Sequence, residues 1–130
     1  MSIAGEITFF HASADDNGDI IPEEVFDGLV KLYHQIEKIQ WYFDDPVYNY
    51  ESVIIGGETR DSYEIENIIE SVIQFCTEAK NLSWSFNGRL LITEDLDEDT
   101  RSLIMDIHEY IIYVIVYEGH GKITKSTINI

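Results

Sequence analysis

The clearest local signal in the chain is the stretch WSFNGRLLI at residues 84–92. At its centre, Asn87-Gly88 supplies the positive φ angles that a type I′ turn between two antiparallel strands requires. The stretch therefore predicts a β-hairpin near residues 83–93, and hence a sheet in the fold.

Helices are predicted on the N-terminal side of this hairpin. The segment 22–24, Pro-Glu-Glu, opens the first, because proline is tolerated in a first turn and acids favour the positive end of the helix dipole. Apolar residues then recur at three- and four-residue spacing as far as Ile39, so this helix runs to about Gln40. A second helix begins near Asp61, with Glu64 at the spacing of a capping box.

Short strands are predicted on either side of these helices. Residues 7–10 form a first strand, which a polar turn at 13–19 follows. Residues 47–55 form another strand, closed by two glycines. Residues 111–117 are rich in β-branched residues and tyrosine, which favours a strand, although helical spacing also fits them. If they form a strand, the next turn returns the chain into a last strand at 122–130.

Between the hairpin and residue 111, a cluster of acids predicts the start of a third helix, which continues through Leu103, Ile104 and Ile107. The chain has the length and apolar content for one core, so residues 1–130 form a single acidic α+β domain. We expect an antiparallel or mixed sheet packed against two or three helices.

Charge is the extreme property of the sequence, because 25 acidic and 8 basic residues give a formal net charge of −17. Direct binding to nucleic acid or to an anionic membrane surface is driven by Lys and Arg, so neither is an expected ligand. Self-repulsion of this size costs stability and calls for an explanation. The plainest explanation that involves no specific function is a halophilic or merely well-solvated surface.

The expected location is the cytoplasm. Residues 1–10 lack the basic and apolar regions of a secretion signal, and the longest apolar run, residues 110–117, is too short to span a bilayer. Cys76 is the single cysteine, which excludes an intramolecular disulfide and suits a reducing compartment.

The motifs of catalysis are missing. There is no nucleophile elbow, no glycine-rich phosphate loop and no HExxH pattern, and the four histidines are scattered along the chain. We therefore predict that the protein is not an enzyme and that it needs no cofactor, with calcium as the one alternative.

That alternative comes from residues 13–24, SADDNGDIIPEE, which resemble an EF-hand calcium loop. Asp15 and Asn17 stand at the third and fifth positions, Gly18 at the turn glycine and Glu24 at the bidentate twelfth position. The resemblance implies calcium ligands at Asp15, Asn17 and Glu24. The competing interpretation is a strand-to-helix connection capped by its own acids.

Small size, strong acidity and no catalytic parts are typical of two kinds of protein. One is the immunity or antitoxin protein that neutralises a nuclease, and the other is the nucleic-acid mimic, phage proteins among them, that occupies a basic cleft. Carboxylates can compete for the Lys and Arg that such partners present to phosphates. The sequence thus predicts an inhibitor of a basic protein that acts on nucleic acid.

The predicted partner surface combines acids with aromatic residues, because aromatic side chains anchor interfaces and charge steers encounter. Its residues are Trp41, Tyr42, Asp44, Asp45, Glu66, Glu70, Asp95, Asp97, Glu98 and Asp99. For any single aromatic here, a place in the core is the competing interpretation. A further alternative is a structural subunit that forms homo-oligomers, in which the last strand, residues 122–130, pairs with its copy.

Overall fold

The computed structural model describes residues 2–57, 64–96 and 99–130, without the side chains of residues 94–100. The fold is α+β, with one antiparallel sheet and helices on one side of it. Its elements in chain order are β1 (Ser2–His11), α1 (Ser13–Asp16), α2 (Glu23–Gln35), α3 (Glu37–Gln40), β2 (Val47–Tyr48), β3 (Val53–Gly56), α4 (Ile65–Asn81), β4 (Trp84–Leu96), β5 (Asp99–His108), β6 (Ile111–Tyr117) and β7 (Ile123–Asn129).

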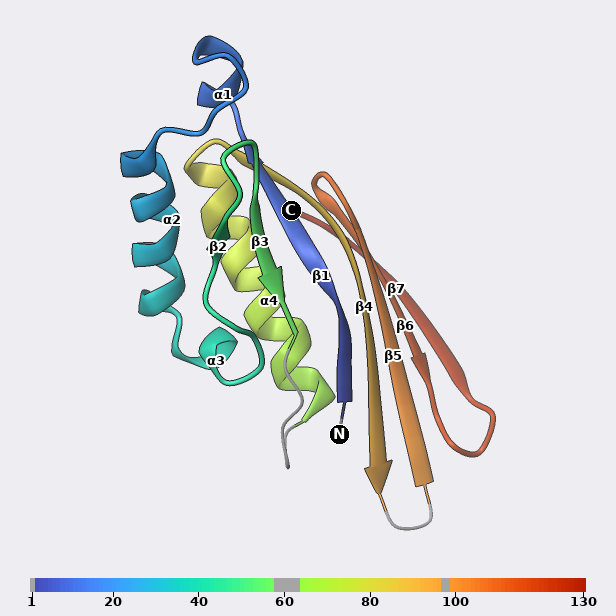
Figure 1. The fold of residues 1–130 in the computed structure, drawn as a ribbon. Helices are drawn as coiled ribbons and strands as arrows, with labels where there is room; N and C mark the ends of the chain where they lie inside the picture. The colour runs from blue at the N-terminus through green and yellow to red at the C-terminus, as the bar shows by residue number, and fades with distance from the viewer. Residues whose placement is uncertain (1, 58–63, 97–98) are drawn as a thin grey trace.

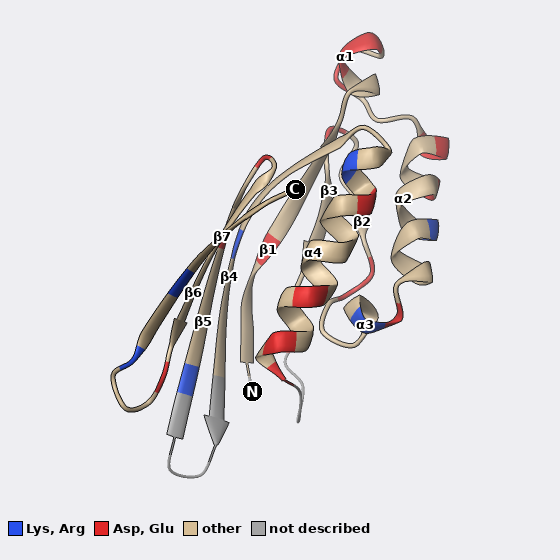
Figure 2. Ribbon diagram, turned by 180° about the vertical axis from the view of Figure 1, so that it is seen from behind, with Lys and Arg blue, Asp and Glu red and all other residues tan. Residues whose placement is uncertain are grey.

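The described strands form one open sheet of seven, in the order β2-β3-β1-β4-β5-β6-β7. Every pair is antiparallel, and β4 to β7 follow one another as a meander. Figures 1 and 2 show α2, α3 and α4 together over the half of the sheet that contains β1 and β3. The sheet therefore has a helical face, an open face and two exposed edges.

Strand alternation places the core on the helical face. In β4, Trp84, Phe86, Leu90 and Ile92 are buried at even positions, whereas Leu91 is exposed on the other face. The same alternation continues through β5 and β6. The core side chains of these two strands are Leu103, Met105, Ile107, Ile112 and Val114.

Aromatic rings join the helices to the sheet at the centre of the core. Phe75 of α4 lies 5.3 Å from Phe9 of β1 and 6.0 Å from Tyr33 of α2, measured between ring centroids. The Tyr33 hydroxyl donates a hydrogen bond to the backbone carbonyl of Phe43 at 2.8 Å, so its one polar group is satisfied. Burial of these rings supplies much of the free energy that holds α2 and α4 on the sheet.

The predicted hairpin at residues 83–93 is wrong, because this stretch is one continuous central strand. Asn87 pairs with Thr8 on one side and His108 on the other. The Asn87 side-chain oxygen accepts a hydrogen bond from the backbone N–H of Glu109 at 3.1 Å, so the asparagine supports the β5–β6 turn. A glycine is needed at position 88 for a different reason: a Cβ there would lie 2.4 Å from the backbone carbonyl oxygen of Glu6 on the neighbouring strand.

The predicted third helix is also wrong. Residues 99–108 form β5, which pairs with β4 over its whole length and with β6 from Ser102 to His108. Leu103, Met105 and Ile107 are buried at two-residue spacing, which is the period of a strand. This spacing outweighs the acids before the segment, which had indicated the start of a helix.

Several boundaries differ from the predictions. The first helix is interrupted at Ile36, whose φ of −102° and ψ of 96° are extended. Residues 47–55 form two strands, β2 and β3, with a turn that includes Tyr50 at a φ of 62°. The turn at 13–19 contains α1. Asp61 lies outside the described residues, and Glu64 directly precedes α4. The strands at 111–117 and 122–130 are confirmed as β6 and β7.

Within the described ranges, none of the helices combines the length and the apolar character needed to cross a membrane.

Cys76 lies on the buried face of α4, with no exposed surface. Burial raises the pKa of this thiol far above its usual value, so the thiolate is disfavoured. We expect no reaction with a thiol reagent such as Ellman's in the native protein, and one reactive thiol per chain after unfolding in urea. Rapid labelling of the native protein would contradict the buried position.

Candidate functional site

A group of exposed acids lies where β1 passes through α1 into α2. Figure 2 shows this concentration of acids on α1 and at the start of α2. The ion pairs found among the described residues involve other carboxylates. We call this group the acidic end, and it consists of Asp15, Asp16, Asp19, Glu23, Glu24 and Glu51.

The end of β2 and the turn that follows it join the acidic end through two hydrogen bonds. The N–H of Ile21 donates to the carbonyl of Tyr50 at 2.7 Å, and the Tyr48 hydroxyl donates to the carbonyl of Ile21. Ile21 itself is fully buried, so it anchors the connection before α2. These contacts bring Glu51 to the acids of the α1–α2 segment.

Aromatic side chains accompany the acids. The Tyr48 ring lies 5.0 Å from Phe26 and 4.9 Å from Tyr50, and Tyr50 is 64% exposed. The pKa of Tyr48 is raised, first by burial and then by the nearby Glu23, Tyr50 and Glu24. The smaller, electrostatic contributions to this shift include those of Glu23 and Glu24, whose negative charges would also attract an approaching cation.

A cleft of about 400 Å³ opens at this end of the sheet. Asp15, Asp19 and Glu51 lie on its wall together with Phe10 and Tyr110. Phe10 is 41% and Tyr110 38% exposed, and the Nζ of Lys80 already lies over the Tyr110 ring, 4.8 Å from its centroid. Carboxylates beside aromatic rings suit a guanidinium or ammonium group, through charged hydrogen bonds and cation–π contact.

His11 also lines the cleft, but both of its ring nitrogens are engaged. Nδ1 lies 2.7 Å from the hydroxyl of Ser13, and Nε2 lies 2.8 Å from the carbonyl oxygen of Leu82. The ring also packs edge-on against Trp84 at 4.7 Å. These contacts give His11 a structural role at the end of β1.

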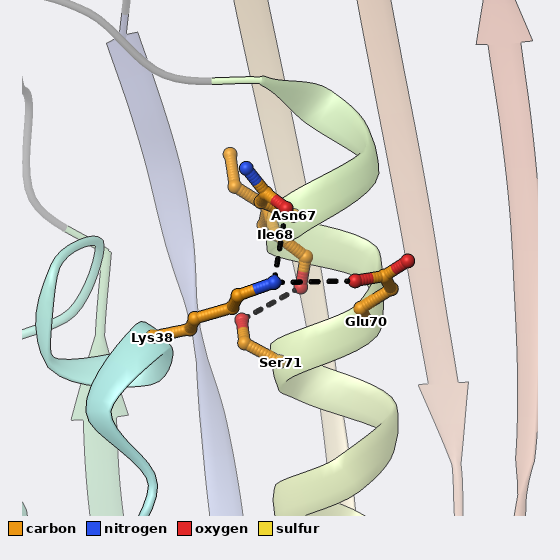
Figure 3. Close-up of polar contacts among 5 residues, drawn as sticks. All are labelled: Lys38, Asn67, Ile68, Glu70 and Ser71. Atoms are coloured by element: carbon orange, nitrogen blue, oxygen red, sulfur yellow. Dashed lines mark hydrogen bonds and ion pairs between the residues drawn. The ribbon is translucent and has the colours of Figure 1, made fainter.

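Glu66 and Glu70, predicted as partner contacts, are exposed on α4 but take part in ion pairs. Lys38 of α3 lies 3.5 Å from Glu70 and donates to Asn67 at 3.3 Å, as Figure 3 shows. Arg101 of β5 donates to Glu66 at 2.8 Å, and this hydrogen bond lowers the pKa of Glu66. Both carboxylates therefore tie α4 to its neighbours.

The other predicted contacts separate into exposed and buried residues. Trp41 is 47% exposed, and Asp44 and Asp45 beside it are also exposed. Tyr42 is only 2% exposed, so its ring belongs to the core and is not available to a partner. The side chains of the last four predicted residues lie outside the described part of the chain, namely Asp95, Asp97, Glu98 and Asp99.

The three predicted calcium ligands lie in one helix, one turn and another helix. Asp15 is part of α1, Asn17 donates its side-chain N–H to the carbonyl of Ser13 at 2.9 Å, and Glu24 is in the first turn of α2. The described residues include no group of three or more His, Cys, Asp or Glu arranged to hold a metal ion. Calcium binding stays a prediction.

Sequence reasoning missed the acidic end as a partner surface, since none of its six residues is among the predicted partner contacts. Its signal is present in the density of acids between residues 15 and 24, but that density was assigned to a calcium loop. Glu51 and Tyr110 join through long-range contacts, which no local pattern reports. Compared with known protein families, with curated proteins and with solved structures, the chain finds no match.

Proposed function

We propose that this protein is an acidic inhibitor that binds a basic, nucleic-acid-acting protein and blocks it, in the manner of an immunity protein, an antitoxin or a phage-encoded nucleic-acid mimic. It acts by binding alone, without catalysis, in the cytoplasm. The acidic end is its main contact surface, and Trp41, Asp44 and Asp45 form a second one.

The observation that carries the proposal is the cleft, where Asp15, Asp19 and Glu51 stand beside exposed aromatic rings. Acids that serve only solubility would need no aromatic rings beside them. A cationic side chain of a partner would be stabilised by both the carboxylates and the aromatic rings. The partner class follows from the same chemistry. Proteins that hold phosphates present Lys and Arg in clusters, and carboxylates can occupy those clusters.

Net charge supports fast association with such a partner. A chain of −17 draws a basic surface towards it over about a Debye length, which is roughly 8 Å at physiological salt. The aromatic surface of Tyr50, Phe10 and Tyr110 then supplies contact area that charge alone does not give. Binding should therefore be fast at low salt and weaken as salt is added.

The test begins with capture of the tagged protein's partner at low salt, elution at high salt and assay of the eluted protein for nuclease or nucleic-acid binding. The double variant Glu24→Lys with Glu51→Lys should bind that partner about tenfold to a hundredfold more weakly, mainly through slower association, and should lose inhibition. Kinetics are measured by surface plasmon resonance at two salt concentrations.

A matched control changes the net charge by the same amount elsewhere. Glu37→Lys with Glu78→Lys alters exposed acids of α3 and α4 and leaves the acidic end intact. This control should retain most of the affinity. Equal losses in the two double variants would mean that only net charge matters, and an unchanged affinity in both would refute the proposed surface.

A further inference from the structure

The two edges of the sheet are exposed to different degrees. β2 is two residues long and follows Pro46, so little unpaired backbone is available there. β7 is seven residues long, and six of them are exposed while Ile128 is partly buried. The β7 edge therefore offers a row of backbone groups to another strand.

Hydrogen bonds to β6 show which groups of β7 are free. The N–H of Glu118 donates to the carbonyl of Lys122 at 2.8 Å, and the N–H of Ile130 donates to the carbonyl of Tyr110 at 2.8 Å. In an antiparallel pair the bonded positions alternate, so even-numbered residues of β7 bond to β6. The N–H and carbonyl groups of Ile123, Lys125, Thr127 and Asn129 point away from the sheet.

The charge of β7 favours a copy of the same chain as its partner. The strand contains no acid, no proline and one cation, Lys125, in a chain with a net charge of −17. Two copies that meet at β7 therefore approach through one of their least acidic surfaces. The helices lie over the opposite half of the sheet in Figure 1, so the acidic helical layers remain apart.

We propose that β7 pairs antiparallel with β7 of a second copy, about a two-fold axis at Ser126. In this register Lys125 lies opposite Thr127 of the second copy, and Ile123 lies opposite Asn129. All seven residues of each strand are paired, and the free groups supply about eight hydrogen bonds. A shift by two residues that centres on Lys125 would place the two lysines opposite each other, which is unfavourable.

This dimer and the proposed inhibitor complex respond to salt in opposite directions. Added salt screens the repulsion between two acidic chains, so self-association should become stronger. Binding to a basic partner should become weaker under the same conditions. The dimer also forms without the partner, so either proposal can fail while the other holds.

The first experiment is sedimentation velocity of the full chain over a range of protein concentrations at low and high salt. We expect a concentration-dependent dimer of the 15.0 kDa chain that is favoured by salt. Thr127→Pro removes an outward N–H without removing a bond to β6, and should raise the dimer dissociation constant about tenfold or more. Thr127→Ala keeps the N–H and should dimerise like the native chain.

A second experiment tests the register and does not depend on a proline. Ser126→Cys places two thiols across the two-fold axis, at a non-hydrogen-bonded pair with Cα atoms about 4.5 Å apart, which is within reach of a disulfide. Mild oxidation should give a covalent dimer on a non-reducing gel, whereas Thr124→Cys, opposite Ile128 of the second copy, should not. Cys76 is buried and does not compete.

The proposal is overturned by a monomer at every concentration and salt, by a Thr127→Pro variant as dimeric as the native chain, or by equal cross-linking of the two cysteine variants. Retained far-UV circular dichroism in each variant confirms that the fold is intact.

Discussion

Gly88→Ala should destabilise the protein by about 3 kcal/mol or more, because the added methyl group has no space between β1 and β4. Its Cβ would lie 2.4 Å from the carbonyl oxygen of Glu6 and 2.8 Å from the Cα of Ile7. Both atoms belong to the backbone of a central strand, which cannot move aside without loss of pairing. Urea unfolding followed by circular dichroism measures the change in the free energy of unfolding.

Gly28→Ala is the matched control. Gly28 lies within α2, and a Cβ there meets nothing within 4 Å. Alanine is the better helix former, so this variant should be more stable by up to about 1 kcal/mol. If Gly88→Ala were as stable as the native protein, the close approach of β1 and β4 would be wrong.

The glycine at 88 also explains why the hairpin prediction failed. Asn-Gly in a turn and Asn-Gly in a tightly packed central strand look the same in sequence, because both use a residue without a side chain. What distinguishes them is the neighbouring strand, β1, which lies about eighty residues away along the chain and pairs with β4 from Ser2 to His11. A local pattern holds no information about that pairing.

The strand prediction for residues 111–117 succeeded on residue type, although helical spacing also fits this segment. Residues 111–117 are β-branched or tyrosine and form β6. The helix prediction for the preceding segment, residues 99–108, was wrong. The acids before this segment indicate the start of a helix, whereas Leu103, Met105 and Ile107 alternate as in a strand. The segment is a strand because β5 pairs with β4 on one side and β6 on the other, and this pairing buries those three residues.

The candidate site was harder to predict than the fold class. The sequence shows which residues are acidic, but the ion pairs of Glu66 and Glu70 depend on where α3 and β5 lie. Tyr42 and Trp41 are neighbours of the same chemical type, yet one is in the core and the other is half-exposed. Only the three-dimensional contacts separate acids that hold the fold together from acids that remain available to a partner.

The two tryptophans should separate stability from binding. Trp84 is 1% exposed, packs on His11 and lines the space beneath α2, so Trp84→Ala should cost about 3–5 kcal/mol of stability. Trp41 is 47% exposed, so Trp41→Ala should cost less than about 1 kcal/mol. Urea unfolding of both variants, followed by circular dichroism, measures these differences.

The effects on partner binding should be the reverse of those on stability: the Trp41 variant should bind more weakly than any Trp84 variant that still folds. If Trp41 anchors the second contact surface beside Asp44 and Asp45, then Trp41→Ala weakens binding about tenfold or more while the fold stays intact. A conservative change in the core, Trp84→Phe, should keep the affinity, because it leaves the acidic end and Trp41 in place. A Trp41→Ala variant that binds like the native protein would remove Trp41 from the interface and leave the acidic end as the only proposed contact.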